Sequence, residues 1–376
     1  MISFGFQLER AAEIHSFEDG QVIFEAGQRG ETMYVILAGQ VAITLGDQQI
    51  DLLEVGSLFG EMALVDEKPR SATATAVGAT SLARIDQTAF AELVQQSPAF
   101  ALDVMAIMSQ RLRRMVENEA EYLRLEQELL LGREIQLSLL PGSCPEVPGW
   151  DMAAAYRAAQ TIGGDLYDFV QDPDQPDQLY LVTADVTGKG IPAALFMASS
   201  RSILRSACFT GQGPAAVLGQ ANRITKLDTR APLFLSAFIS RLDIHSGRLE
   251  YANAGHELPL LIRAKSGDLE TLEARGILLG AFPELDYEQH EIPLLAGDIV
   301  VYFTDGITEA RNDAGDFYGL ERLQALLRGQ EWTTADQVLE AILNAVAEFV
   351  GDTPASDDLT VVVVRRREAS PASQPE

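Results

Sequence analysis

Four short acidic stretches, each at the edge of an apolar or β-branched run, constrain the fold of this chain most strongly. Apolar runs of this length predict β-strands, and we expect these strands to gather the acidic residues at one end of a sheet. Clustered carboxylates repel one another and are costly to bury without a cation. The four stretches are GGDLYD (163–168), VTADVTGKG (182–190), VYFTDGITE (301–309) and SDDLT (356–360).

The second stretch alone has a simpler explanation. An apolar run over residues 179–183 leads to Asp185. After it come a glycine-rich turn and a predicted helix with Pro192 in its first turn. An aspartate here could merely cap the turn or the helix. The recurrence of the pattern favours a metal site instead. Oxygen ligands without Cys or His suit hard cations such as Mg²⁺ or Mn²⁺.

Together with YANAGH (251–256) and GILLG (276–280), these motifs occur in an order that resembles the SpoIIE/RsbU-type serine phosphatases. These are bacterial members of the PPM class of metal-dependent protein phosphatases. The resemblance covers about residues 130–366 and implies an α+β sandwich, two antiparallel sheets between layers of helices. Periodicity alone predicts mixed α/β structure. The strands are expected at 151–156, 179–184, 235–242, 248–253, 258–262, 298–303 and 359–365, and the helices at 192–207, 214–228, 319–327 and 334–350.

The resemblance also implies a two-metal site holding Mn²⁺ or Mg²⁺, whose activated water attacks the phosphorus of a phosphoserine in line without a phosphoenzyme. Eukaryotic relatives carry a phosphate-binding Arg where this chain has Gln160, and Arg157 is the nearest basic residue. The bridging motif lacks their His and has Thr187 and Lys189. The resemblance implies that Asp185 bridges the two metal ions and that the backbone carbonyl of Val186 binds one of them. Asp305 and Asp357 would bind the second metal ion, with Asp358 beside them. Asp165 would act through water molecules bound at the site.

Residues 1–97 carry short apolar runs separated by glycines at 27, 30, 39 and 46, a pattern typical of a β-roll. The expected strands cover 22–24, 33–37, 41–45 and 50–53. Residues 56–64 start a short helix whose N–H groups, with the fork of a nearby Arg, could hold a phosphate. The stretches 56–64 and 69–74 resemble the phosphate-binding cassette of cyclic-nucleotide-binding domains, over about residues 8–116.

That resemblance implies a regulatory cyclic nucleotide, with cAMP favoured over cGMP. Gly60 and Glu61 would face the ribose, Arg70 and Ser71 the cyclic phosphate, and Ala72 would contribute backbone. The alternative is a β-roll that has lost its ligand, with the Arg and Glu of the cassette simply paired. Two hydroxyl residues that contact adenine in catabolite activator protein correspond here to Met115 and Val116, so the base preference stays open.

Residues 98–140 predict one long helix with no interior proline, ended by Pro141-Gly142. Apolar residues at 3–4 spacing favour a parallel homodimeric coiled coil, although an ordinary amphipathic helix fits as well. The basic run 111–114 is interpreted as a solvated face, and Gly132 as a flex point. The expected seam contains Met105, Met108, Leu112, Met115, Tyr122, Leu125 and Leu129.

Composition sets the remaining bounds. A formal charge of −27 argues against nucleic-acid binding, and no apolar run reaches the ~20 residues of a membrane span. Two cysteines allow neither a disulfide framework nor a thiolate metal site. Glu9 and Arg10 interrupt the N-terminal stretch, which therefore lacks a signal-peptide core, so we expect a cytoplasmic protein. The expected domains are a β-roll (1–97), a helical linker (98–140), a phosphatase domain (141–367) and a disordered tail (368–376).

The sequence therefore predicts a cyclic-nucleotide-regulated serine phosphatase. Its expected substrate is a small phosphoprotein such as an anti-sigma-factor antagonist, as the resemblance implies. Two alternatives stay open: a catalytically dead phosphatase fold that acts as a binding module, and a nucleotide-gated transcription regulator. The acidic charge and the lack of a recognition helix after residue 140 oppose the second.

Overall fold

The computed structural model describes residues 13–62, 68–228 and 232–368. The predictions for residues 1–12, for the cassette helix beyond residue 62 and for the tail from 369 onward lie outside these ranges. The chain divides into two compact units, Met1–Arg124 and Leu125–Glu376, which are described separately.

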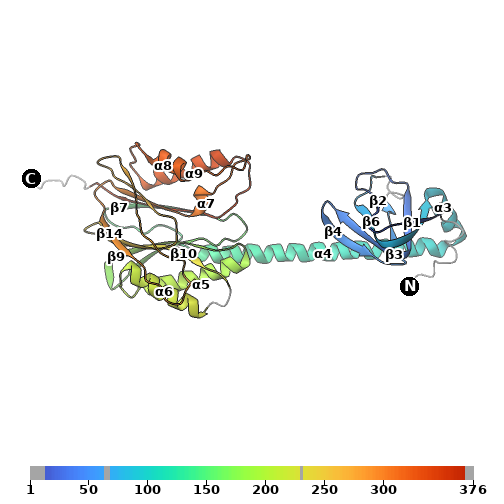
Figure 1. Cartoon of the computed structure of the whole chain (residues 1–376), viewed down its shortest axis with the longest axis horizontal. Helices are drawn as coiled ribbons and strands as arrows, with labels where there is room; N and C mark the ends of the chain where they lie inside the picture. Colours follow the sequence, from blue (N-terminus) through green and yellow to red (C-terminus); the bar gives the residue numbers. More distant parts are fainter. Residues whose placement is uncertain (1–12, 63–67, 229–231, 369–376) are drawn as a thin grey trace, which may run out of the picture. The chain divides into compact units, whose positions relative to one another are not determined.

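The first unit is an antiparallel β-roll (Figure 1), in the strand order β1-β6-β3-β4, with β2 paired to β6 and β5 paired to β3. Two apolar clusters form its core, and Met33 and Leu82 are fully buried in one cluster each. The elements are β1 (Glu13–Phe17), β2 (Val22–Phe24), β3 (Thr32–Leu45), β4 (Gln48–Leu53), β5 (Leu58–Phe59), β6 (Thr73–Asp86) and α3 (Gln87–Gln96).

The predicted turn at Gly39 is wrong. The segments 33–37 and 41–45 form one continuous strand, β3, whose pairing with β6 shifts register on either side of Ala38. Gly39 has a φ of 82°, and a Cβ added there would lie 2.5 Å from the hydroxyl of Thr80. A glycine is needed because β6 passes so close, and not because the chain reverses.

Helix α4 (Pro98–Leu139) confirms the predicted long helix. It begins in the first unit, where Phe100 and Val104 are buried in the β-roll core, and it ends in the second unit. Met108, one of the expected seam residues, packs partly buried against the same core. Several other apolar side chains of α4 are exposed, among them Leu112 at 62%. None of the described helices, α4 included, is long and apolar enough to cross a membrane.

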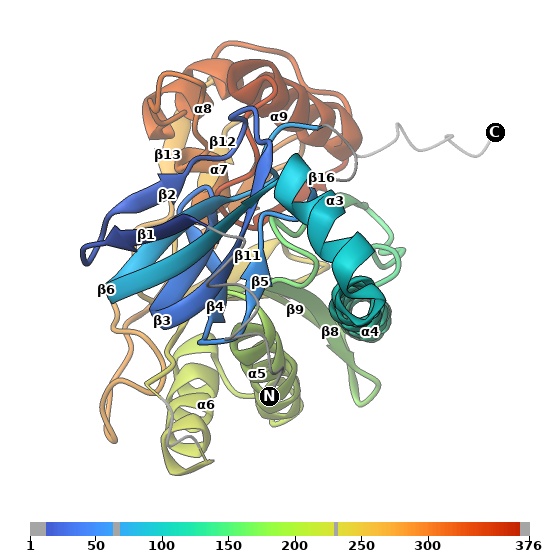
Figure 2. The same ribbon diagram turned by 90° about the vertical axis from the view of Figure 1, so that its right-hand side faces the viewer.

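The second unit has four layers (Figure 2), with two five-stranded antiparallel sheets between pairs of helices. Helices α5 (Ile191–Cys208) and α6 (Pro214–Asp228) cover the sheet β14-β11-β10-β9-β8. Helix α9 (Ala335–Val350), beside α8 (Leu320–Leu327), covers the sheet β13-β12-β15-β16-β7. This architecture confirms the predicted sandwich. The strands are β7 (Trp150–Arg157), β8 (Leu166–Asp172), β9 (Gln175–Val186), β10 (Leu235–Asp243), β11 (Arg248–Ala254), β12 (Leu260–Ile262), β13 (Leu269–Thr271), β14 (Gln289–Pro293), β15 (Ile299–Phe303) and β16 (Leu359–Arg366).

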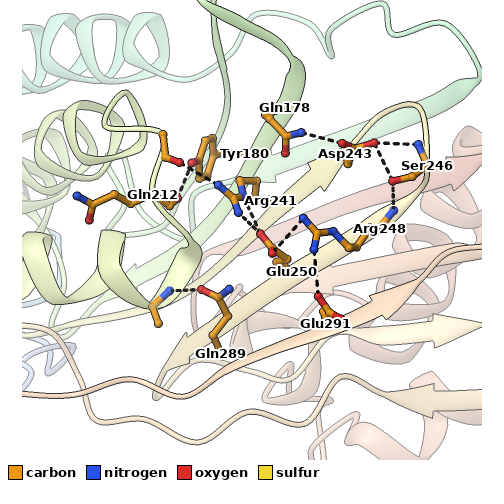
Figure 3. Close-up of polar contacts among 12 residues, drawn as sticks. Gln178, Tyr180, Gln212, Arg241, Asp243, Ser246, Arg248, Glu250, Gln289 and Glu291 are labelled. Atoms are coloured by element: carbon orange, nitrogen blue, oxygen red, sulfur yellow. Dashed lines mark hydrogen bonds and ion pairs between the residues drawn. The ribbon is translucent and has the colours of Figure 1, made fainter.

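Polar side chains tie the strands of the first of these sheets together at one end (Figure 3). Glu250 on β11 bonds Arg241 on β10 and lies 3.4 Å from Arg248, which in turn reaches Glu291 on β14 at 3.3 Å. Asp243 accepts from Gln178 and from Ser246. This network compensates the buried charge of Glu250, and we assign it a structural role.

Candidate active site

The acidic residues converge from both sheets, so the prediction that a single sheet gathers them is wrong. Asp165 immediately precedes β8 and Asp185 is near the end of its neighbour β9. Asp305 follows β15 as the first residue of the short helix α7 (Asp305–Thr308), and Asp357 lies just before the adjacent strand β16. Charge interactions link Asp185 with Asp305 and Asp357, which shows that the two pairs meet between the sheets.

Close backbone packing holds these segments together. A Cβ added to Gly306 would lie 1.7 Å from the carbonyl oxygen of Asp358, so α7 can pack on the 357–358 segment only with glycine there. A Cβ on Gly163 would collide with the Asp358 carboxylate at 2.2 Å. The glycines of the first and third acidic motifs thus permit the approach that brings the carboxylates together.

Burial and mutual repulsion raise the pKa values of these carboxyl groups. Burial, followed by the charge of Asp305, raises the pKa of Asp185 to about 7. Burial, followed by the charge of Asp185, raises the pKa of Asp165 well above its usual range. The pKa of Asp305 is also raised, first by burial and then by Asp357. A bound cation would reverse these shifts by stabilising the charged forms.

Two of the predicted residues have structural partners. Asp358 is buried, and its carboxylate accepts from the backbone N–H groups of Ala159 at 2.8 Å and Gly164 at 2.5 Å. Asp165 accepts from the hydroxyls of Thr304 and Thr360 at 2.7 Å each. Asp358 therefore fixes the loop before β8. Asp165 is oriented by Thr304, which follows β15, and by Thr360, near the start of β16.

Lys189 and Asp357 form the contact that bears most directly on metal binding. The Lys189 ammonium lies 2.9 Å from the Asp357 carboxylate and also donates to the Ser356 carbonyl. No group of three or more His, Cys, Asp or Glu side chains in the described ranges stands ready to hold a metal ion. The oxygen atoms of these carboxylates are donors of the kind that Mg²⁺ and Mn²⁺ prefer. Asp357 already pairs with the Lys189 ammonium, so a metal ion bound by Asp357 would have to displace it.

The helix that precedes this domain contacts the first acidic motif. The Gln136 side chain of α4 is buried, donates to the Gly163 carbonyl at 2.6 Å and accepts from its N–H at 3.1 Å. Gly163 lies two residues before Asp165. Sequence reasoning missed Gln136, because a single glutamine within a long helical run carries no pattern of its own.

A cavity of about 230 Å³ borders the site at Asp357. Arg157 and Arg311 line it, together with an apolar face of α9 that includes Leu343 and Val346. Two guanidinium groups beside a carboxylate cluster favour an anionic substrate in a chain whose net charge is −27.

His256, the last residue of the YANAGH motif, is a buried structural residue. The Asn253 side chain donates to the His256 carbonyl and accepts from the His256 N–H. The His256 Nδ1 lies 2.7 Å from the Ser236 hydroxyl. Burial lowers the pKa of His256 to about 3. A ring that stays neutral at pH 7 is a poor proton donor, so we assign His256 a structural role.

The β-roll contains the second cavity, of about 690 Å³. All five predicted cassette residues, Gly60, Glu61, Arg70, Ser71 and Ala72, line it. Arg70 is not paired with Glu61, so the Arg–Glu pair expected for a β-roll that has lost its ligand does not form. It donates to the carbonyls of Gly60 and Thr32 at 2.7 Å each. Burial lowers its pKa.

Helix α4 closes this cavity, and the residues that do so differ from those expected. Met115 lines the cavity, whereas Val116 lies outside the lining and is 61% exposed. Arg111 and Arg114 also line it. The interpretation of the basic run as a solvated face is wrong for Arg111, which pairs with Glu61, whereas Arg114 is exposed.

Comparison with known proteins decides the family. A model described as "Stage II sporulation protein E (SpoIIE)" matches residues 175–367, and a "Cyclic nucleotide-binding domain" model matches residues 14–97. The chain belongs to the SpoIIE family. Its second unit is a PPM-class protein phosphatase domain, and its first unit is a cyclic-nucleotide-binding domain.

Individual relatives agree with this membership in the SpoIIE family. Phosphoserine phosphatase RsbU of Bacillus subtilis is 32% identical over 243 residues, which cover 65% of this chain and 71% of RsbU. The cyclic AMP receptor protein of Thermus thermophilus is 36% identical over 102 residues, 26% of this chain and 47% of that protein. The SiaA-PP2C domain of Pseudomonas aeruginosa shares the fold, with a TM-score of 0.59, 22% identity and coverage of 65% of this chain and 98% of that domain.

Proposed function

We propose that this SpoIIE-family phosphatase removes phosphate from phosphoserine on a small regulatory protein, and that a cyclic nucleotide in the β-roll sets its rate. The observation that carries the catalytic half is the meeting of Asp185, Asp305 and Asp357 between the two sheets. Their mutual repulsion is the arrangement that a pair of divalent cations relieves.

In this proposal two Mn²⁺ or Mg²⁺ ions are held by Asp185, the Val186 carbonyl, Asp305 and Asp357. When bound, they supply the charge that activates water and neutralises the phosphoryl oxygens. Asp165, aligned by its two threonine partners, orients the solvent around Asp185, and Asp358 acts through the loop that it fixes. These assignments agree with the close approach of Gly164 to the Val186 carbonyl, which a Cβ would meet at 3.2 Å.

The proposed substrate carries a phosphoserine, as the name of RsbU indicates for that relative. A phosphorylated anti-sigma-factor antagonist is the specific candidate. The arginine-lined cavity beside Asp357 supports an acidic partner, because Arg157 and Arg311 would offset the repulsion between a phosphoprotein and the carboxylates.

The proposed regulation runs through α4. This single helix presents Arg111 to the nucleotide cavity in the first unit and Gln136 to the first acidic motif in the second. A shift of its last turns would move Gly163 and hence Asp165. The proposed ligand class is a cyclic nucleotide, with cAMP as the first candidate and cGMP tested beside it.

The test is phosphate release from a phosphoserine protein in Mn²⁺, with and without cAMP or cGMP. We expect Mn²⁺-dependent turnover, lost in Asp185→Asn and in Asp305→Asn, with the matched exposed variant Asp313→Asn unaffected. Turnover that survives in either active-site variant would reject these metal ligands. A wild-type chain that binds substrate without turnover would instead favour the catalytically dead binding module.

A further inference from the structure

The cavity of about 230 Å³ in the second unit lies where β7 ends and β16 begins. Arg157, the last residue of β7, and Leu359, the first residue of β16, are paired in the sheet, and both line the cavity. The second half of α9 forms another wall, and the chain that leaves this helix at Gly351 continues along the cavity to Asp357. The cavity and the proposed metal site therefore share Asp357.

The wall formed by α9 is apolar. Leu343, Val346, Ala347 and Val350 follow one another at helical spacing and line the cavity. Val346 is 4% exposed, whereas Ala347 is exposed, so this stripe runs from the domain core to the surface. The volume is below the roughly 300–1,000 Å³ of pockets that hold a whole drug-sized ligand. It suits a single side chain.

Two guanidinium groups of this cavity lack acidic partners among the described residues. The structure gives neither Arg157 nor Arg311 an ion pair or a side-chain hydrogen bond within that part of the chain. Arg311 lies over the Phe317 ring, 4.5 Å from its centre, a contact that orients the guanidinium and leaves its N–H donors free. Arg241 and Arg263, in the same unit, each pair with a carboxylate instead. The cavity therefore offers donors to an anion that comes from outside the chain.

We propose that this cavity is a specificity subsite for the phosphoserine segment of the substrate. It receives one apolar side chain within about two residues of the phosphoserine, and Arg157 and Arg311 bind an acidic side chain next to it. The inference rests on the proposed phosphatase activity. The short separation follows from the shared Asp357, because an extended segment advances only about 3.3 Å per residue and a phosphoserine at the metal site brings its neighbours to the cavity.

The two halves of the subsite have separate effects on the rate. An apolar side chain covered by the α9 wall leaves water, and shortening it to Ala forfeits that gain, which corresponds to at least about tenfold in kcat/KM. Arg157 and Arg311 are exposed, so an acidic neighbour gains up to about fivefold from each.

The experiment measures kcat/KM of the full chain in Mn²⁺ on synthetic phosphoserine peptides. Each of the two positions on either side of the phosphoserine carries Leu, Ala, Asp or Lys in turn, with Ala at the others. We expect one position at which Leu is preferred over Ala by at least about tenfold, and a neighbouring position at which Asp is preferred over Lys.

Variants of the chain assign these preferences to the cavity. Ala347→Phe fills the cavity from an exposed helix position and should abolish the preference for Leu, whereas Asn344→Phe, exposed on α9 outside the lining, should keep it. Arg157→Gln combined with Arg311→Gln should abolish the preference for Asp. Arg328→Gln, an exposed arginine outside the lining, is the control and should keep it.

Every other outcome has a stated meaning. Equal rates on all peptides overturn the subsite and leave the phosphatase proposal intact, as does hydrolysis of p-nitrophenyl phosphate without turnover of any peptide. A preference for Leu that survives in Ala347→Phe also overturns the subsite. Absence of turnover on the peptides and on p-nitrophenyl phosphate overturns the proposed function and the subsite together. The wild-type peptide series needs no substitution, so it tests the inference even if Ala347→Phe does not fold.

Discussion

At the scale of single residues, Lys189 forms a contact that the sequence did not predict. It pairs with Asp357, and the two side chains are 46% and 34% exposed. Such a partly exposed pair contributes up to about 1 kcal/mol. If Asp357 is a metal ligand, as we propose, a bound metal ion would displace the ammonium, and Lys189 would oppose metal binding.

We therefore predict that Lys189→Met binds Mn²⁺ up to about fivefold more tightly than wild type, measured by calorimetric titration. Lys226→Met, on α6 away from the carboxylates, is the matched control and should bind as wild type does. Weaker Mn²⁺ binding by Lys189→Met would show that the ammonium supports the metal site instead of competing with it.

His256 gives a prediction for pH. Burial lowers its folded-state pKa from an unfolded value of 6.5 to about 3, so the unfolded chain takes up a proton that the folded chain does not. The corresponding stability is present above pH 6.5 and is lost as the pH falls toward 3. Between pH 7 and pH 5 the loss is about 2 kcal/mol.

The check is urea unfolding of wild type and His256→Gln at both pH values. Carboxylates with raised pKa values change stability in both chains alike, so the difference between the chains isolates the histidine. We expect wild type to lose more stability than His256→Gln on acidification. An equal loss in the two chains would contradict a neutral, buried His256.

At the scale of elements, α4 is the connection between the two units, and Gln136 is its contact with the first acidic motif. The side chain makes two hydrogen bonds to the Gly163 backbone, at 2.6 and 3.1 Å. We predict that Gln136→Ala makes the phosphatase rate insensitive to nucleotide while nucleotide affinity stays within about threefold of wild type.

Gln127→Ala, an exposed glutamine of the same helix, is the control for Gln136→Ala and should respond as wild type does. Rates are measured as phosphate release at zero and saturating nucleotide. A full response in Gln136→Ala would remove this contact from the regulatory route.

The elements also show what the sequence can and cannot predict. Strands with long apolar runs, such as β9, β10 and β16, were predictable because both faces are buried and the hydrophobic signal is continuous. Strand β8 was missed, since its sequence LYDFVQD carries acidic residues, although Asp168 is buried against Arg201 and Arg205.

The convergence of the acidic residues was predictable for a similar reason, as each of these aspartates lies next to a recognisable apolar run. What the sequence could not reveal were partners set by tertiary contact. Lys189 with Asp357 and Arg111 with Glu61 are examples, since each pair joins segments that no local pattern relates.

At the scale of the whole molecule, we propose a parallel homodimer through α4. Leu112 and Tyr122 are 62% and 66% exposed, and apolar side chains of this size seldom stay in water along an entire helix. Leu112→Asp should shift the mass measured by light scattering from dimer to monomer, because a charge in the seam is costly to bury.

Arg113→Asp, at the adjacent position, is the control for Leu112→Asp and should leave the dimer in place. A wild-type monomer at micromolar concentration would contradict the proposed dimer.

The central claim is that nucleotide occupancy of the β-roll sets the rate of the phosphatase domain. The most direct test is the initial rate of phosphate release from a phosphoserine protein by the full chain, measured against the concentration of cAMP or cGMP at saturating Mn²⁺. The account predicts a saturable change of about 5-fold to 150-fold, with a midpoint at the dissociation constant from calorimetry. A rate that stays constant while the nucleotide demonstrably binds would contradict it, because the two domains would then share only a helix.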